Sequence, residues 1–234
     1  MAADIESIVR DNLAKVRERI ADACAESGRS PEGVTLVGVS KYVGPAETAA
    51  LVAAGCDVLG EARPQQLWEK AAAQELAALP IRWRLIGHLQ RNKATRTVPI
   101  CDSIDSVDSP RLLKAVASAA EAAGKWQRIL LEVNVSGDAE KHGFTPDATA
   151  DALGEAAETP SLEVRGLMGM AAREGGVDVA RRNFADLRRL RDRLATPALP
   201  LKELSMGMSG DLEAAIAEGA THVRVGSALW QGLR

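Results

Sequence analysis

The chain has 234 residues, of which 46% are hydrophobic, enough to bury the core of one large α/β domain or two small ones. Its formal net charge of -3 gives no electrostatic basis for binding nucleic acid or an anionic membrane surface. No apolar run is long enough to span a bilayer, and the acidic N-terminus does not resemble a signal peptide. We therefore predict a cytoplasmic protein that binds neither nucleic acid nor membranes.

A covering helix is predicted over about residues 3–27, because apolar residues recur on one helical face and Gly28 follows as a stop. Eight short apolar runs then follow, each typical of a buried strand. They lie at residues 34–41, 56–61, 81–88, 100–104, 128–135, 162–168, 201–205 and 221–225. Helices are predicted between them at residues 46–54, 64–79, 91–97, 109–124, 146–158 and 211–218, with a longer one carrying Phe184, Leu187, Leu190 and Leu194.

This alternation predicts a single-domain (β/α)8 barrel that spans residues 1–234. A doubly wound open sheet also alternates strands and helices, but no glycine-rich phosphate loop follows the first strand. Polar residues also recur within the strand runs, where Glu132 and Asn134 share one parity and Arg224 lies between two valines. In a barrel these side chains can point into the lumen near its mouth.

Lys41 ends the first strand run and is the most unusual residue in it. An ammonium group drawn into apolar surroundings loses hydration, which lowers the pKa of a lysine and frees a nucleophilic amine for Schiff-base chemistry with an aldehyde. The alternative is a lysine at a strand end that extends its ammonium group to water.

Two glycine-containing turns follow the seventh and eighth strands, where barrels often bind phosphate. The first comprises Ser205, Met206, Gly207, Met208, Ser209 and Gly210, and the second Gly226 and Ser227. Their small residues let backbone N–H groups approach an anion, although ordinary glycine turns would look alike. In a closed barrel Lys41 lies beside the eighth strand, so one ligand could offer an aldehyde to Lys41 and a phosphate to these turns. Pyridoxal 5'-phosphate has both groups, and Arg224 would face its ring nitrogen.

Eight motifs in order resemble the pyridoxal phosphate homeostasis protein family, which is related to the N-terminal barrel of alanine racemase. The motifs are Val39–Lys41, Gly60–Glu61, Leu85–Lys93, Asp102–Asp105, Val133–Val135, Arg165–Met168, Leu204–Ser209 and Val223–Ser227. The resemblance implies pyridoxal phosphate on Lys41, phosphate contacts from Ser205, Gly207, Gly226 and Ser227, and Arg224 at the ring nitrogen. It also implies a role in cofactor storage, delivery to apo-enzymes that depend on it, and amino-acid and keto-acid balance, without established catalytic turnover.

Two residues depart from the family pattern, because Ala62 and Arg84 stand where the family has asparagine and histidine, near the expected mouth. Two other functions stay open: an amino-acid racemase, which would need a second proton donor from a further domain, and a Schiff-base aldolase acting on a sugar phosphate. We expect a cofactor carrier rather than a dedicated enzyme, and a monomer. The three histidines, His88, His142 and His222, lack the helical spacing of a metal pair, and the cysteines are widely spaced, so no metal site or disulfide is predicted.

Overall fold

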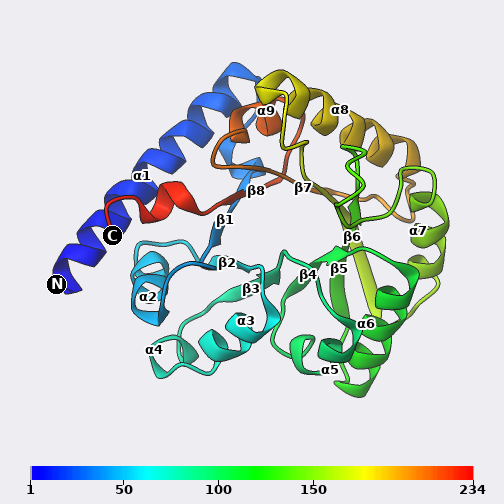
Figure 1. Ribbon diagram of the computed structural model, residues 1–234, viewed down its shortest axis with the longest axis horizontal. Coiled ribbons are helices and arrows are strands. Elements are labelled where there is room, and N and C mark those ends of the chain that lie inside the picture. The colour runs from blue at the N-terminus through cyan, green and yellow to red at the C-terminus, as the bar shows by residue number, and fades with distance from the viewer. Residues whose placement is uncertain (1, 234) are drawn as a thin grey trace.

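The computed structural model describes residues 2–233, which form a closed barrel of eight parallel strands. The strands pair in chain order and β8 returns to pair with β1, so the predicted (β/α)8 architecture is confirmed. Figure 1 shows the helices arranged around the outside of the ring of strands. The strands are β1 (Thr35–Val39), β2 (Val58–Glu61), β3 (Arg82–Leu85), β4 (Ser103–Val107), β5 (Gln127–Val133), β6 (Leu162–Gly169), β7 (Glu203–Met208) and β8 (His222–Val225).

The α-helices are α1 (Ala2–Glu26), α2 (Pro45–Ala53), α3 (Pro64–Ala71), α4 (Gln74–Ala77), α5 (Ala94–Thr97), α6 (Pro110–Ala122), α7 (Thr149–Ala157), α8 (Gly176–Leu194) and α9 (Leu212–Ala217). Three short 3-10 helices, η1 (Pro31–Gly33), η2 (Arg91–Lys93) and η3 (Ser227–Trp230), complete the set. Helix α1 precedes the barrel and packs against α2, α9 and η3, beside the C-terminal segment in Figure 1.

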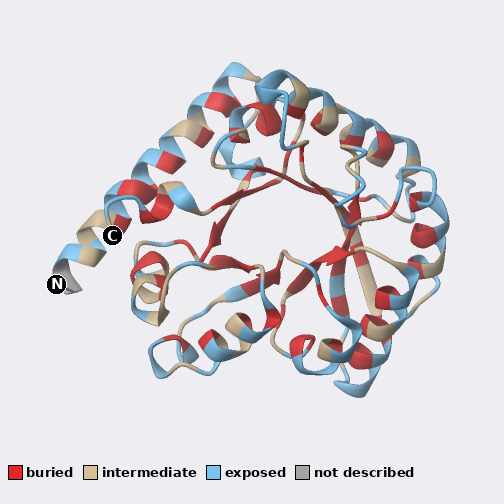
Figure 2. Ribbon diagram, in the orientation of Figure 1, coloured by how far each residue is buried: buried red, intermediate tan, exposed pale blue. Residues whose placement is uncertain are grey.

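Helix α6 illustrates how the sequence specifies these elements. Ser109 accepts a hydrogen bond from the backbone N–H of Leu112, and Pro110 occupies the first turn, where its missing N–H has no cost. Leu112, Leu113 and Val116 lie on one face and are buried. Figure 2 shows the same arrangement around the ring, with buried residues in the strands and on the helix faces turned toward them. No helix within residues 2–233 has the length and apolarity to cross a membrane.

Several elements differ from their predicted bounds, and the local structure explains two of these differences. Strand β4 begins at Ser103 instead of residue 100, because the backbone N–H groups of Ile100 and Cys101 donate to the carbonyl of Thr97 and continue the preceding turn. The predicted helix 64–79 is divided into α3 and α4, since Ala73 adopts an extended backbone conformation. After this break α4 buries Leu76 in the core.

The barrel interior holds a buried ion network centred on Arg84, which reaches the first residues of β7 and β8. Its guanidinium group donates hydrogen bonds to Asp105 (2.9 Å) and Glu203 (2.9 Å) and lies 3.1 Å from Nε2 of His222. Burial opposes the charge of Arg84, but the two carboxylates raise its pKa. Arginine has no lone pair to offer, so His222 accepts at Nε2 and its Nδ1–H points to Thr221 (2.9 Å). Burial, and then Arg84, lower the pKa of His222 to about 4.

The expectation that Arg84 lies near the mouth of the barrel is therefore wrong. It is 5% exposed inside the barrel and joins side chains of β3, β4, β7 and β8. Its role in this chain is to neutralise buried carboxylates, which are costly without a partner.

Candidate functional site

The eight predicted site residues lie within β7 and β8 or just after the C-terminal ends of β1, β7 and β8, which are adjacent strands of the closed barrel. Two strand pairings set this arrangement: Val37 lies opposite Arg224, and Met208 lies opposite Arg224 from the other side. Four of the residues are buried and four are partly or fully exposed. The buried ones are Ser205, Met206, Gly207 and Arg224, and the others are Lys41, Ser209, Gly226 and Ser227.

Lys41 lies in the turn after β1, two residues beyond the last strand residue, and is half-buried. The expectation of a lysine enclosed within a buried strand is therefore wrong, because the strand ends at Val39. Lys41 shares the parity of Val37 and Val39, and its Nζ lies 4.7 Å from the ring centroid of the exposed Tyr42. A lysine in this position can reach both the mouth of the barrel and the solvent.

A buried cluster fixes the backbone beneath Lys41. Lys70 on α3 donates hydrogen bonds to the backbone carbonyl of Ser40 and to the Glu61 carboxylate, and the Ser40 hydroxyl donates to the same carboxylate at 2.8 Å. On the other side, the indole N–H of Trp230 donates to the carbonyl of Val39 at 2.8 Å. These contacts hold the turn from two directions, and the sequence analysis did not predict them.

The end of β7 requires glycine at position 207. Gly207 has a φ of +90°, and a Cβ there would lie 2.4 Å from the Cβ of Ala215. Nearby, the backbone N–H of Met208 donates to the carboxylate of Asp211 at 2.5 Å, so that part of the turn is occupied by the chain's own acceptor. The predicted phosphate contact Ser205 lies below the turn, where its hydroxyl accepts a hydrogen bond from Arg224.

The turn after β8 leaves backbone donors available. Within residues 2–233 the N–H groups of Gly226 and Ser227 have no protein hydrogen-bond acceptor. Gly226 packs beside β1, since a Cβ at this position would lie 3.4 Å from the Cβ of Val39. Free N–H groups at a turn edge are suited to bind an anion.

Arg224 projects into the barrel, as its alternation with two valines predicted, and is 4% exposed. Its guanidinium group donates to the Ser205 hydroxyl at 2.8 Å and to the carbonyl of Gly169 at 3.0 Å. Burial lowers the pKa of Arg224, and the carboxylates of Asp105 and Glu132 oppose this effect. Arg224 thus presents an oriented cation inside the barrel, below the turns.

Glu132 on β5 is a second buried titratable group of the interior. It is 4% exposed, and no donor among residues 2–233 hydrogen-bonds its carboxyl group. Burial, and then the nearby Asp108, raise the pKa of Glu132 to about 7, while Arg224 lowers it. Sequence parity placed Glu132 in the lumen. Its neighbour by parity, Asn134, instead orders the following loop by donating to the carbonyl of Asp138 at 2.8 Å.

The family described as alanine racemase, N-terminal domain, matches residues 10–233. A Pseudomonas aeruginosa protein named pyridoxal phosphate homeostasis protein is 40% identical over 96% of this chain and 95% of its own length. The Escherichia coli K12 protein of the same name is 33% identical over 95% of each chain.

Solved structures give the same result. PipY of Synechococcus elongatus, solved with PLP bound, superposes with a TM-score of 0.83 at 32% identity, covering 94% of this chain and 99% of that one. An alanine racemase of Clostridium difficile shares the fold, with a TM-score of 0.73 at 16% identity over 96% of this chain and 56% of that one. From the near-complete coverage at 33–40% identity we conclude that this chain belongs to the pyridoxal phosphate homeostasis protein family.

Proposed function

We propose that this chain binds pyridoxal 5'-phosphate covalently through the Lys41 amine and acts as a carrier of this cofactor in vitamin B6 homeostasis. One observation carries the proposal: an amine, free backbone N–H groups and a buried cation lie at the same ends of two adjacent strands, β1 and β8. When bound, the cofactor would supply an aldehyde to the amine and a phosphate to the N–H groups.

The residues present fit this ligand. Lys41 is accessible at the rim, and the N–H groups of Gly226 and Ser227 can receive a phosphate without losing a protein partner. Ser209, in the turn after β7, is half-buried, and we propose its hydroxyl as a further phosphate donor. Ser205, Met206 and Gly207 are buried, so we propose that they shape the wall of the site and orient Arg224.

Arg224 would limit the reactions that a bound cofactor could support. Its guanidinium group only donates hydrogen bonds and stays protonated, so a pyridine nitrogen placed beside it stays unprotonated. An unprotonated ring is a poor electron sink, which disfavours transamination and decarboxylation. The racemase alternative remains a testable outcome: racemisation of several amino acids by the purified chain would replace the carrier proposal.

The decisive experiment is borohydride reduction of the protein after incubation with pyridoxal phosphate, followed by peptide mass spectrometry. We expect a phosphopyridoxyl adduct on Lys41, no adduct in Lys41→Ala, and an unchanged adduct in the control Lys202→Ala, which alters an exposed lysine elsewhere. Adducts spread over several surface lysines, or none on Lys41, would refute the assignment.

We further propose that the chain acts as a cytoplasmic monomer and that its recipients are apo-enzymes that depend on pyridoxal phosphate. Incubating the loaded chain with such an apo-enzyme should restore the enzyme's activity. The restoration should be faster than spontaneous release of the cofactor from the chain would allow. Equal rates would argue for storage without direct delivery. Sedimentation of the loaded and free chain would test the monomer.

A further inference from the structure

A second cluster of polar side chains lies at the ends of β3, β4 and β5, on a different arc of the barrel from Lys41. Nδ1 of His88 lies 2.8 Å from Oδ2 of Asp108, and Nδ1 of His142 lies 3.8 Å from the same oxygen. The two imidazole rings are stacked, with centroids 4.1 Å apart and an interplanar angle of 15°. Three separate segments of the chain thus place three ligand atoms around one point.

The backbone positions of these residues are fixed by the fold. His142 lies in the loop after β5, and this loop is tied back to the strand by bonds between Phe144 and the backbone of Glu132 (2.8 Å) and Asn134 (2.9 Å). The segments that carry His88 and Asp108 are joined by a hydrogen bond from the Ser106 hydroxyl to the carbonyl of Gly87 (2.7 Å). The fold therefore fixes the backbone segments that carry the three residues.

Two imidazoles and one carboxylate form a ligand set that suits late first-row divalent metal ions. With metal–ligand bonds of about 2.0–2.2 Å, donor atoms in a tetrahedral site are about 3.4 Å apart. The observed separations of 2.8 and 3.8 Å bracket this value. Small side-chain movements would therefore bring the three donor atoms to coordination distance.

One such movement is specified by the stacked rings. A metal ion lies in the plane of each imidazole that binds it, and two parallel rings cannot both satisfy this condition. The His142 side chain is 59% exposed, whereas that of Asp108 is 6% exposed. His142 is therefore the ligand free to turn, and metal binding would break the stack.

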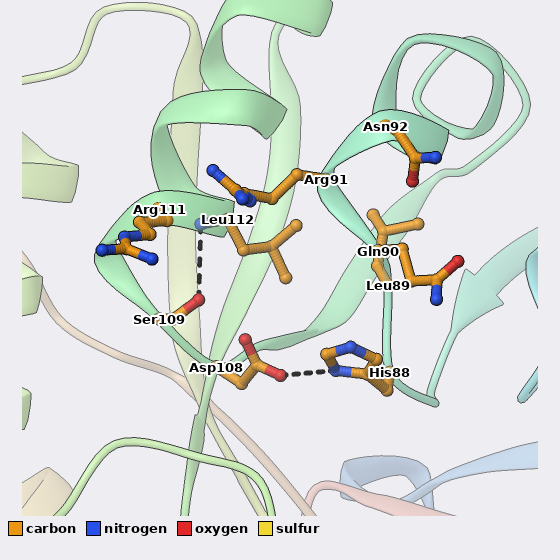
Figure 3. A pocket seen from close by; sticks show the side chains of 9 residues that line it. All are labelled: His88, Leu89, Gln90, Arg91, Asn92, Asp108, Ser109, Arg111 and Leu112. Atoms are coloured by element: carbon orange, nitrogen blue, oxygen red, sulfur yellow. Dashed lines mark hydrogen bonds and ion pairs between the residues drawn. The ribbon is translucent and has the colours of Figure 1, made fainter.

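The cluster also has an open side. A hollow of about 510 Å³ is lined by His88 and Asp108, whose side chains point toward each other in Figure 3. It gives water or an anion access to the remaining coordination positions. Arg91 and Arg111 line the same hollow and would balance a negatively charged co-ligand of the metal.

We propose that His88, Asp108 and His142 form a binding site for a divalent transition-metal ion of the Zn²⁺ class. The site does not include Lys41, so metal binding can be tested on the chain without the cofactor. The residue spacing alone predicted no metal pair, because His88 and His142 are brought together by the side-by-side pairing of β3, β4 and β5.

The test is calorimetric titration of Zn²⁺ into the full chain after removal of metal with a chelator. We expect one ion per chain, and binding weakened at least about tenfold by each of His142→Ala, His88→Ala and Asp108→Asn. The control Asp147→Asn, an exposed carboxylate on the same loop as His142, should leave the affinity unchanged. Circular dichroism would confirm that each variant is folded. Because the His142 side chain is exposed, we expect His142→Ala to disturb the fold least.

A second readout uses Co²⁺ as the spectroscopic probe. Visible d–d bands of Co²⁺ should appear with the wild-type chain and disappear with His142→Ala. Three results would overturn the proposal: no Zn²⁺ binding to the wild-type chain, Zn²⁺ binding by all three ligand variants that is as tight as that of wild type, or a cobalt–thiolate absorption band showing that a cysteine holds the ion.

Discussion

Replacing Glu132 with glutamine removes a buried carboxyl group whose ionisation the folded barrel opposes. The side chain is 4% exposed and its folded-state pKa is about 7, against 4.5 for the free group. Between these two values the folded chain holds a proton that the unfolded chain has released, so wild-type stability falls as the pH rises. The loss begins near pH 4.5 and is complete above pH 7.

The magnitude follows from this pKa difference, since a shift of one pKa unit corresponds to about 1.4 kcal/mol and the full difference to about 3 kcal/mol. Glutamine has nearly the same shape and does not ionise. We therefore expect Glu132→Gln to be close to wild type in stability at low pH and more stable by about 2–3 kcal/mol at pH 8.

The assay is urea unfolding of the cofactor-free protein at pH 5 and pH 8, followed by tryptophan fluorescence. The quantity to compare is the difference in unfolding free energy between variant and wild type, because every other titrating group is common to both. Glu69→Gln, which alters an exposed carboxylate on α3, serves as the control and should show no such change. A Glu132→Gln difference that is the same at both pH values would refute the reasoning.

Three further predictions concern the buried polar groups. Arg84→Met leaves Asp105 and Glu203 buried without their cation and should lower the unfolding free energy by about 3–5 kcal/mol, measured by urea unfolding at pH 7. His222 is neutral in the folded state, with a pKa of about 4, so its stabilising effect is present above pH 6.5 and lost as the pH falls toward 4. Relative to His222→Gln, wild type should lose about 2–3 kcal/mol between pH 7 and pH 4, and a constant difference would contradict this. Burial raises the pKa of Cys101 to about 12, so alkylation at pH 8 should modify it only after unfolding, as peptide mass spectrometry would show.

The sequence alone determined the architecture of this chain. Strand-like runs alternate with amphipathic helices in a repeating local pattern, and each element buries one face whatever its distant neighbours are. The same reasoning located the ends of the strands where Lys41, Gly226 and Ser227 lie, because barrel strands place their C-terminal ends on one face. It also oriented Arg224, since alternation along a strand fixes the side to which a residue points.

The tertiary structure decided what local patterns do not encode. Arg84 and His222 are 138 positions apart and touch only because the barrel closes. Arg84, which departs from the family pattern, thereby becomes the centre of an ion network. The pairing of β3, β4 and β5 likewise stacks His88 on His142. Strand β1 ended before Lys41, which leaves the lysine half-buried rather than enclosed. Burial, desolvation and charge pairing depend on which segments meet in space, and those meetings are set by the closed sheet rather than by any single segment.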